Sequence, residues 1–229
     1  MGTLFDQYRD NYETEINQAI SFSGRNVDFY TQAKAEIFAE LMARSFPDTD
    51  SLRVLDIGCG PASIHPMIAS SLGRLTGVDV AESQLVRAMT ANPDNGYAAY
   101  DGARLPFADN TFDVTFTICV MHHVPPSQWP DFVGEMFRVT TPGGMVVIFE
   151  HNPYNVLTRI VVNRCEFDKD AVLLASSRVM GLLAEAGFVD AFKGFFLVSP
   201  FKAKLFRMLD RGLRRLPLGA QYYVAARTT

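Results

Sequence analysis

The feature that most constrains the fold is a regular alternation of two kinds of segment. Short apolar runs rich in β-branched residues, such as SLRVLDIG, RLTGVDV and TFDVTFTICVMH, end in glycine or a polar turn, and helix-like segments follow them. Alternation of this kind predicts a mainly parallel sheet with helices on both faces. Such sheets bind ligands at the carboxyl ends of their strands. We therefore expect functional residues just after each strand.

The predicted elements follow one another along the whole chain. Strands are expected at 51–58, 74–80, 97–101, 111–122, 145–150, 188–198 and 220–227. Helices are expected from residue 5 to about 46 with a break at 23–26, at 62–72, 81–91 and 128–139, within 172–186, and at 200–216. The stretch 142–144, Pro-Gly-Gly, is expected to be a turn.

The composition suits one globular domain. The 229 residues are 48% hydrophobic and 20% charged, enough to bury a sizeable core, and the net charge of -4 gives no sign of nucleic-acid binding. The three cysteines are odd in number and widely spaced, so we expect neither a disulfide framework nor a structural zinc site, and a reducing cytoplasm fits them. The first 15 residues lack the apolar core of a signal peptide, and no run approaches the roughly 20 apolar residues of a spanning helix.

Charge is unevenly distributed along the chain. Seven of the 21 basic residues but only one of the 25 acidic residues fall within 199–229. The segment 200–216 combines apolar residues with a basic face, a pattern that can lie on an anionic membrane surface. It can equally be a helix that packs on the core with its arginines in solvent. Peripheral membrane contact through 200–216 is therefore one of two interpretations.

The loop VLDIGCGPAS after the first predicted strand has the residues of a nucleotide-binding turn. Gly58 and Gly60 allow the backbone to turn tightly and approach a ligand. The dinucleotide fingerprint GxGxxG would need glycine at the position of Ser63. Asp56 sits poorly beside a pyrophosphate but suits an ammonium group. The loop therefore favours a ligand with an ammonium group and a neutral nucleoside.

Two further acidic residues follow the next two strands. Asp79 lies 21 residues after Gly58, near the spacing at which an acid binds ribose hydroxyls. Asp101 follows the third strand, where its carboxylate can meet an adenine amino group. The first three strand ends together predict a nucleoside-binding edge.

Five segments, in this order and spacing, resemble class I S-adenosylmethionine (SAM)-dependent methyltransferases: DIGCGPAS, GVDVAESQL, DGARLPFADNTFD, VMHHVPPSQW and FRVTTPGGMVVIFE. The resemblance covers about residues 50–150 and is nearest to the branch that includes ubiquinone- and menaquinone-biosynthesis methyltransferases. It implies an α/β, Rossmann-like fold: a seven-stranded, mostly parallel sheet with an antiparallel last strand and helices on both faces. AQYYVAAR is well placed to be that last strand.

The resemblance also implies a cofactor, SAM, with S-adenosylhomocysteine (SAH) as its product. The loop at 58–60 and the acid before it would hold the methionine end, and the acids after the second and third strands would hold the ribose and the adenine. The predicted cofactor set is Asp56, Gly58, Cys59, Gly60, Asp79, Val80, Asp101, Gly102, Ala103, Cys119 and Val120.

Histidines are expected beside the methyl group of the cofactor. In the implied sheet order the fourth and fifth strands are neighbours, and their ends carry His122, His123 and His151. The adjacent pair can be structural, can supply a general base or orient the acceptor, or can bind a metal with Glu150 or His151. An ordinary imidazole pKa of roughly 6.5 suits a base near neutral pH. His123, and then His122, are therefore the catalytic candidates, and His65 is expected to be structural.

Contacts to the acceptor are expected outside the core motifs and at His151. Tyr8 and Tyr12 lie four residues apart in an N-terminal segment that either packs on the core or closes the site as a lid. Tyr154 and Arg159 belong to a long polar insert that either shapes the acceptor pocket or is solvated. We divide the single domain into a helical lid at 1–47, a SAM-binding core at 48–151, and an acceptor-side insert with C-terminal strands at 152–229.

The sequence predicts a cytoplasmic SAM-dependent methyltransferase that acts on oxygen or nitrogen of a small molecule, such as a sugar, a lipid-linked sugar or a secondary metabolite. Carbon methylation stays open. The alternative from another enzyme class is an NAD-dependent oxidoreductase, against which Ser63 and Asp56 speak. A third hypothesis is a non-catalytic module that binds SAM or SAH. The acceptor and the oligomeric state are not identified by the sequence.

Overall fold

The computed structural model describes residues 26–197 and 212–229. Its centre is a seven-stranded sheet with the order β3-β2-β1-β4-β5-β7-β6. The strands are β1 (Arg53–Ile57), β2 (Arg74–Asp79), β3 (Gly96–Ala99), β4 (Phe112–Ile118), β5 (Thr140–His151), β6 (Val189–Phe196) and β7 (Gln221–Arg227). Neighbours among β1 to β5 are parallel, and β7 is antiparallel to both β5 and β6. The predicted Rossmann-like sheet with an antiparallel last strand is confirmed.

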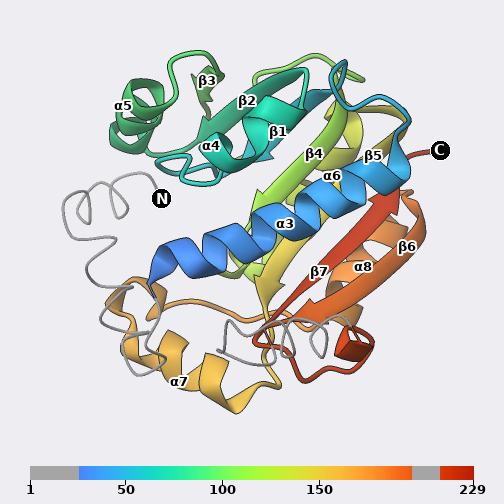
Figure 1. Ribbon diagram of the computed structural model, residues 1–229. Helices are drawn as coiled ribbons and strands as arrows, with labels where there is room; N and C mark the ends of the chain where they lie inside the picture. The colour runs from blue at the N-terminus through green and yellow to red at the C-terminus, as the bar shows by residue number, and fades with distance from the viewer. Residues whose placement is uncertain (1–25, 198–211) are drawn as a thin grey trace.

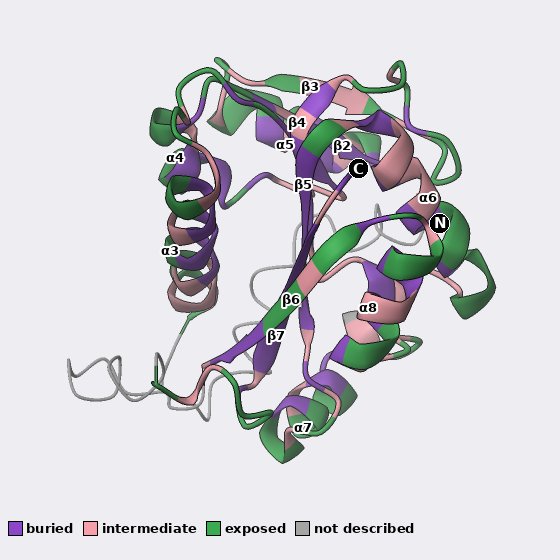
Figure 2. Cartoon of the chain, turned by 90° about the vertical axis from the view of Figure 1, so that its right-hand side faces the viewer, coloured by how far each residue is buried: buried purple, intermediate pink, exposed green. Residues whose placement is uncertain are grey.

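Helices cover both faces of this sheet (Figures 1 and 2). They are α3 (Val27–Ser45), α4 (His65–Ile68), α5 (Glu82–Ala91), α6 (Trp129–Val139), α7 (Val156–Arg164) and α8 (Ser176–Glu185). One face carries α3, α4 and α5, and the other carries α6 and α8, while α7 lies near the carboxyl ends of β4 and β5. Within these described ranges, no helix has both the length and the apolar character needed to cross a membrane.

The apolar runs of the central strands follow from burial on both faces. Successive side chains of a strand point to opposite faces of the sheet. In β5, Met145, Val147 and Phe149 pack in the cluster that contains α3, whereas Val146 and Ile148 pack in the cluster that contains α6 and α8. A strand covered on both sides needs an unbroken apolar run. This packing fixes the carboxyl ends of the central strands, where the predicted site lies.

Three predicted elements have different bounds in the structure. β5 begins at Thr140, because the stretch 142–144 lies within the strand as an irregularity in its pairing with β4 and is not a separate turn. β4 ends at Ile118, because Cys119 has a left-handed φ of +56° and leaves the extended conformation. The predicted helix at 62–72 shrinks to α4 and a 3-10 turn at 69–71, since Pro66 fits only a first helical turn.

The described part of the predicted lid is a layer of the core. Asn26 caps α3 by accepting a hydrogen bond from the amide of Phe29. Phe38 of α3 packs on Phe116 of β4, with 4.6 Å between ring centroids. Residues 27–45 therefore cover one face of the sheet, and the lid at 1–47 stays a prediction. The predicted helix before them, with Tyr8 and Tyr12, and most of the predicted helix at 200–216 lie outside the described residues.

Candidate active site

The glycine loop after β1 is folded against the ends of β2 and β4. Gly58 and Gly60 have φ values of +74° and +52°, which favour glycine. The amides of Gly58 and Cys59 both donate to the carbonyl of Val78, at 2.8 and 3.0 Å. A Cβ atom on Gly58 would lie only 2.5 Å from a methyl carbon of Val120. The loop therefore needs glycine here, and its path brings the predicted Gly58 and Val120 together.

Asp56, near the end of β1, is a buried carboxylate with one unpartnered oxygen. Its Oδ2 lies 3.1 Å from Nε2 of His65, whose Nδ1 lies 2.9 Å from the hydroxyl of Tyr97. Its Oδ1 has no hydrogen-bond partner in the described part of the chain. Burial raises the pKa of the Asp56 carboxyl, and the bond with His65 opposes that rise. An ammonium group of a ligand would satisfy this oxygen and stabilise the charged form.

Asp79 connects the end of β2 to the glycine loop. Its Oδ2 accepts a hydrogen bond from the amide of Gly60 at 2.7 Å, and its Oδ1 accepts one from the amide of Ala81 at 2.8 Å. Burial raises the pKa of the Asp79 carboxyl, while these two bonds lower it. Val80 lies near Gly102, where an added Cβ would be 3.4 Å from a Val80 methyl carbon. The structure thus gathers most of the predicted cofactor residues at the carboxyl ends of the parallel strands.

Asp101 differs from the other two acids because it is exposed. Its Oδ1 accepts hydrogen bonds from the amides of Ala103 and Arg104, at 2.8 and 2.9 Å. The bonds from Arg104 and Ala103 hold the pKa of the Asp101 carboxyl below its ordinary value. The amide of Ala103, a predicted cofactor contact, is therefore engaged within this turn.

His122 lies in the 3-10 turn η3 (Met121–His123), beyond the end of β4, and is buried against β5. Its Nδ1 lies 2.6 Å from Oε2 of Glu150, and its Nε2 lies 3.6 Å from Oδ1 of Asp168. Burial disfavours the charged imidazole, but the two carboxylates outweigh burial and hold the pKa of His122 well above its ordinary value. Because both ring nitrogens face carboxylates, His122 is better suited to positioning its neighbours than to acting as the base.

His123 and His151 flank His122. The ring centroids of His123 and His151 lie 4.1 and 5.1 Å from that of His122. Burial and the positive charge of His122 lower the pKa of both side chains to about 4. Nε2 of His123 lies 3.4 Å from Oδ1 of Asp168, in the 3-10 turn η5 (Glu166–Asp168). The structure therefore brings the three predicted histidines together, with His123 and His151 neutral at pH 7.

Cys119 and Gln221 lie between the predicted cofactor residues and the histidines. Cys119 has a left-handed φ of +56°, which is uncommon for a residue with a side chain, and its amide donates to the carbonyl of Phe149. Gln221 of β7 pairs with His151 of β5. The Nε2 atom of Gln221 lies 3.7 Å from Sγ of Cys119 and 3.4 Å from Nδ1 of His151. The predicted cofactor residue Cys119 is thus within reach of the acceptor side.

The two predicted acceptor contacts in the insert do not join the histidines. Tyr154 is 70% exposed, and Arg159 is exposed on α7. Asn152 is buried instead, and its Nδ2 donates to the carbonyls of Pro217 and Gly219 at 3.0 and 2.8 Å. These bonds tie the start of the insert to the turn before β7. The insert reaches the site through its later part, at Asp168.

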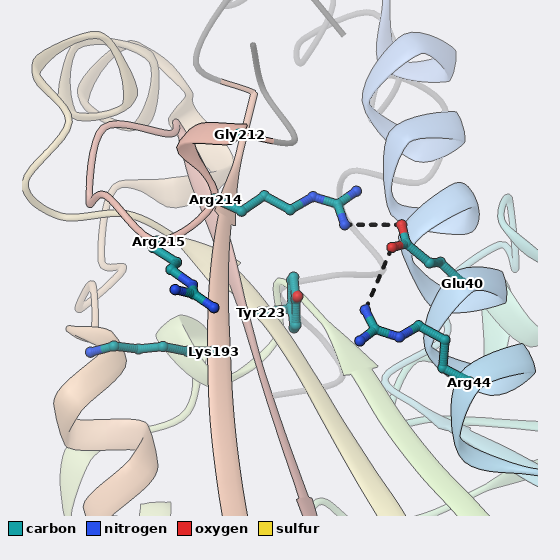
Figure 3. A pocket seen from close by; sticks show the side chains of 7 residues that line it. All are labelled: Glu40, Arg44, Lys193, Gly212, Arg214, Arg215 and Tyr223. Atoms are coloured by element: carbon teal, nitrogen blue, oxygen red, sulfur yellow. Dashed lines mark hydrogen bonds and ion pairs between the residues drawn. The ribbon is translucent and has the colours of Figure 1, made fainter. Parts of the chain in front are cut away.

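A separate pocket of about 440 Å³ opens at the β7–β6 side of the sheet (Figure 3). It is lined by Glu40, Arg44, Lys193, Gly212, Arg214, Arg215 and Tyr223. Nη1 of Arg214 lies 2.9 Å from Oε2 of Glu40, and Nη1 of Arg44 lies 3.8 Å from Oε1 of Glu40. Glu40 therefore ties α3 to the segment before β7. In the strand order this pocket is remote from the glycine loop at β1.

Sequence reasoning missed Asp168 and Gln221. Neither residue belongs to a motif, and Asp168 lies in a polar insert far along the chain from His123. Gln221 had one usable signal: an antiparallel last strand beside β5 places its first residue next to the end of that strand. Asp168 had none, because the path of an irregular insert is set by tertiary contacts.

The sequence is similar to those of known methyltransferases. Residues 55–148 match the family described as a methyltransferase domain. The chain is 30% identical over 156 residues to squalene methyltransferase 1 of Botryococcus braunii, and 31% identical over 161 residues to 24-methylenesterol C-methyltransferase 2 of Oryza sativa subsp. japonica. These matches cover 65% and 66% of this chain but 41% and 43% of the relatives, so the chain spans about two fifths of their length.

A solved structure resembles the whole chain. It is the SAM-dependent methyltransferase, possible histamine N-methyltransferase, of Thermotoga maritima, with a TM-score of 0.71, 15% identity, and coverage of 100% of this chain and 99% of that one. Likeness at this identity shows the fold. The sheet order, the glycine loop and the matched residues agree with it. Residues 55–148 therefore match the methyltransferase-domain family, and the chain has the fold of this SAM-dependent methyltransferase.

Proposed function

We propose that this protein transfers a methyl group from SAM to an oxygen or nitrogen atom of a small molecule. The observation that carries the proposal is the unpartnered Oδ1 of buried Asp56 beside the glycine loop. A buried carboxylate oxygen without a donor is unfavourable, and a cationic ligand relieves that cost. The ammonium group of SAM is such a cation. Asp79, at the next strand end, is our candidate for the ribose hydroxyls.

The chain's own residues would hold the cofactor and leave its methyl group facing the histidines. SAM supplies a methyl group bound to a positively charged sulfur. The glycine loop and Asp56 fit the methionine end of SAM. Cys119 and Val120 come just before His122 in the sequence, so they would lie between the methionine end and the histidines. Methyl transfer needs the acceptor atom in line with the methyl carbon and the sulfur, so positioning supplies much of the rate.

We place the acceptor atom beside His123 and His151. With pKa values of about 4, both imidazoles are neutral at pH 7. In the proposed step, a lone pair of the acceptor oxygen or nitrogen forms the bond to the methyl carbon. The carbon–sulfur bond breaks with its electron pair on sulfur, and the acceptor proton leaves to His123 or to water. A base with this pKa is weak, so proton removal contributes less than alignment.

The lining of the site favours a heteroatom over carbon as the acceptor. One named relative is a C-methyltransferase and one structural neighbour is a possible N-methyltransferase, so the relatives do not decide the acceptor atom. Around His122, two carboxylates and two further imidazoles lie within a few ångströms. Polar groups of this kind suit a hydroxyl or amine, as in a sugar, a lipid-linked sugar or a secondary metabolite, better than an alkene.

The test supplies SAM with an isotopically labelled methyl group and a panel of phenols, sugars and amines, and locates the label by mass spectrometry and NMR. We expect label on oxygen or nitrogen, and label only on carbon would overturn that part of the proposal. The variants His123→Gln and His122→Gln are compared in the same assay, with SAH affinity measured separately by calorimetry. Full turnover by both variants would remove the histidines from the chemistry.

A further inference from the structure

We propose that His122, His123 and Asp168 form a binding site for a divalent transition-metal ion. One ligand atom from each side chain lies within 4.8 Å of the other two. The three residues come from two segments far apart in the sequence, η3 and η5. Two imidazoles and one carboxylate are a ligand set that first-row transition metals use in proteins.

Two of the three separations among these atoms are close to those of atoms that share one metal ion. Two ligands bound tetrahedrally at about 2.0–2.1 Å from a zinc ion lie about 3.4 Å apart. Oδ1 of Asp168 lies 3.4 Å from Nε2 of His123 and 3.6 Å from Nε2 of His122. The carboxylate oxygen is therefore already placed at the edge length of a tetrahedral site with each imidazole.

Glu150 gives His122 the support that metal-bound histidines usually have. Such a histidine commonly donates its other ring N–H to a carboxylate, which fixes the tautomer and the ring orientation. Nδ1 of His122 lies 2.6 Å from Oε2 of buried Glu150, so Nε2 is the nitrogen directed at Asp168. The backbone adds to this support, because the carbonyl of His122 accepts a hydrogen bond from the amide of Val172 at 2.8 Å.

Charge and ligand type narrow the identity of the ion. The cluster holds two carboxylates, Glu150 and Asp168, that face imidazoles in a site with little solvent. A divalent cation would balance both carboxylates. Zn²⁺, Co²⁺ and Fe²⁺ accept imidazole nitrogen, whereas Mg²⁺ and Ca²⁺ prefer oxygen ligands. Without a metal, protons shared between the imidazoles and Asp168 would hold the cluster together, and this is the alternative to be tested.

Three protein ligands leave a fourth position open in a tetrahedral site. If methyl transfer occurs as proposed above, this position lies on the acceptor side, and the acceptor would be a hydroxyl compound whose oxygen binds the ion. The ion would lower the pKa of that hydroxyl, whose proton passes to water before its oxygen attacks the methyl carbon. His123 would then be a ligand and not the base. This extension rests on the proposed function, whereas metal binding itself does not.

Metal binding can be measured without any acceptor. The full chain is freed of metal with a chelator and titrated with Zn²⁺ against a chromophoric competitor, and Co²⁺ absorption reports the coordination. We expect one Zn²⁺ per chain and no comparable binding of Mg²⁺. We expect Asp168→Asn and His123→Gln each to weaken Zn²⁺ binding at least tenfold, and Glu150→Gln to weaken it by about 10–100-fold. Asp170→Asn, at an exposed acid two residues away, should bind as the unaltered chain does.

Two results would overturn the metal site: no stoichiometric Zn²⁺ binding, or binding that Asp168→Asn and His123→Gln both leave unchanged. Circular dichroism of each variant checks that a loss of binding is not a loss of folding. SAH calorimetry on the same metal-free protein separates this proposal from the proposed function. Zn²⁺ binding without SAH binding would support the metal site and overturn the methyltransferase proposal. SAH binding without Zn²⁺ binding would overturn the metal site and support the methyltransferase proposal.

Discussion

At the scale of single residues, the proposed binding of SAM depends most on Asp56. Nε2 of His65 contacts Oδ2 of this carboxylate, so the Asp56 side chain cannot rotate toward another hydrogen-bond partner without losing that bond. The other oxygen is buried and has no donor in the described ranges. A cationic ligand that reaches this oxygen gains a charge-assisted hydrogen bond, which is stronger than a neutral one.

We therefore expect Asp56→Asn to weaken SAH binding. A hydrogen bond to a charged group contributes about 1.5–3 kcal/mol, so the dissociation constant should rise by about ten- to a hundredfold. Isothermal titration calorimetry with SAH measures this directly. Asp48→Asn removes an exposed acid in the loop before β1 and is the matched control, with no expected effect. Unchanged affinity in Asp56→Asn would show that the ammonium group binds elsewhere.

At the scale of elements, the site depends on how closely the glycine loop approaches β4. Alanine at position 58 would have to adopt a φ near +74° and place its Cβ 2.5 Å from Val120. The left-handed conformation costs about 1–2 kcal/mol and overpacking about 1–3 kcal/mol, so we expect Gly58→Ala to lose about 2–5 kcal/mol of unfolding free energy. Urea denaturation measures the loss, and SAH affinity should fall with it.

The control for this substitution makes the same chemical change in a helix. Gly134 lies inside α6, and a Cβ there would meet nothing within 4 Å. Alanine is the better helix former by about 0.8–1.0 kcal/mol, so Gly134→Ala should raise the unfolding free energy by about that amount. If both variants changed stability in the same direction, backbone conformation and the contact with Val120 could not be the cause of the loss at Gly58.

The other ends of β1 and β4 are joined by a pair of charged side chains. Nε and Nη2 of Arg53 donate to the two oxygens of Asp113 at 3.1 and 2.8 Å, and the amide of Arg53 donates to Oδ2 at 2.9 Å. The hydrogen bond from the Arg53 side chain holds the pKa of Asp113 below its ordinary value. Because this pKa is lower in the folded state, the pair stabilises the fold above the unfolded pKa of about 3.9 and loses that effect as pH falls through the folded pKa.

We expect Asp113→Asn to be less stable than the unaltered chain at pH 7. Both side chains are partly exposed, so solvent screening keeps the contribution at about 1 kcal/mol or less. The difference in unfolding free energy should shrink as pH is lowered from about 5 toward 3. Urea denaturation of both proteins at several pH values measures it. A difference that stays constant over this range would mean that the charge of Asp113 is not what matters.

At the scale of the whole molecule, the sequence predicted the sheet and the cofactor residues better than the contacts among the residues expected near the acceptor. The succession of strands along the chain and the positions of Asp56 and Asp79 follow from apolar periodicity and from residues at strand ends, which are local signals, whereas the order of the strands in the sheet was implied by the family resemblance. The pairing of His122 with Glu150 and Asp168 is not local, because it joins a turn after β4, the end of β5 and an irregular insert. Adjacent histidines indicated a site, but their partners, and hence their pKa values, needed the tertiary structure.

Binding of the cofactor stabilises the whole folded protein, so thermal unfolding tests which cofactor binds. A ligand at about 100 times its dissociation constant stabilises the folded state by about 2.7 kcal/mol. For a chain of about 150–250 residues, each kcal/mol raises the melting temperature by about 2–4 °C, so saturating SAH should raise it by about 5–10 °C. NAD should give no comparable shift, because Asp56 lies where a pyrophosphate would meet a like charge. Asp56→Asn, with a dissociation constant about ten- to a hundredfold higher, should lose about half of the shift or more at the same SAH concentration. A shift with NAD and none with SAH would replace the methyltransferase proposal with an oxidoreductase on the same sheet.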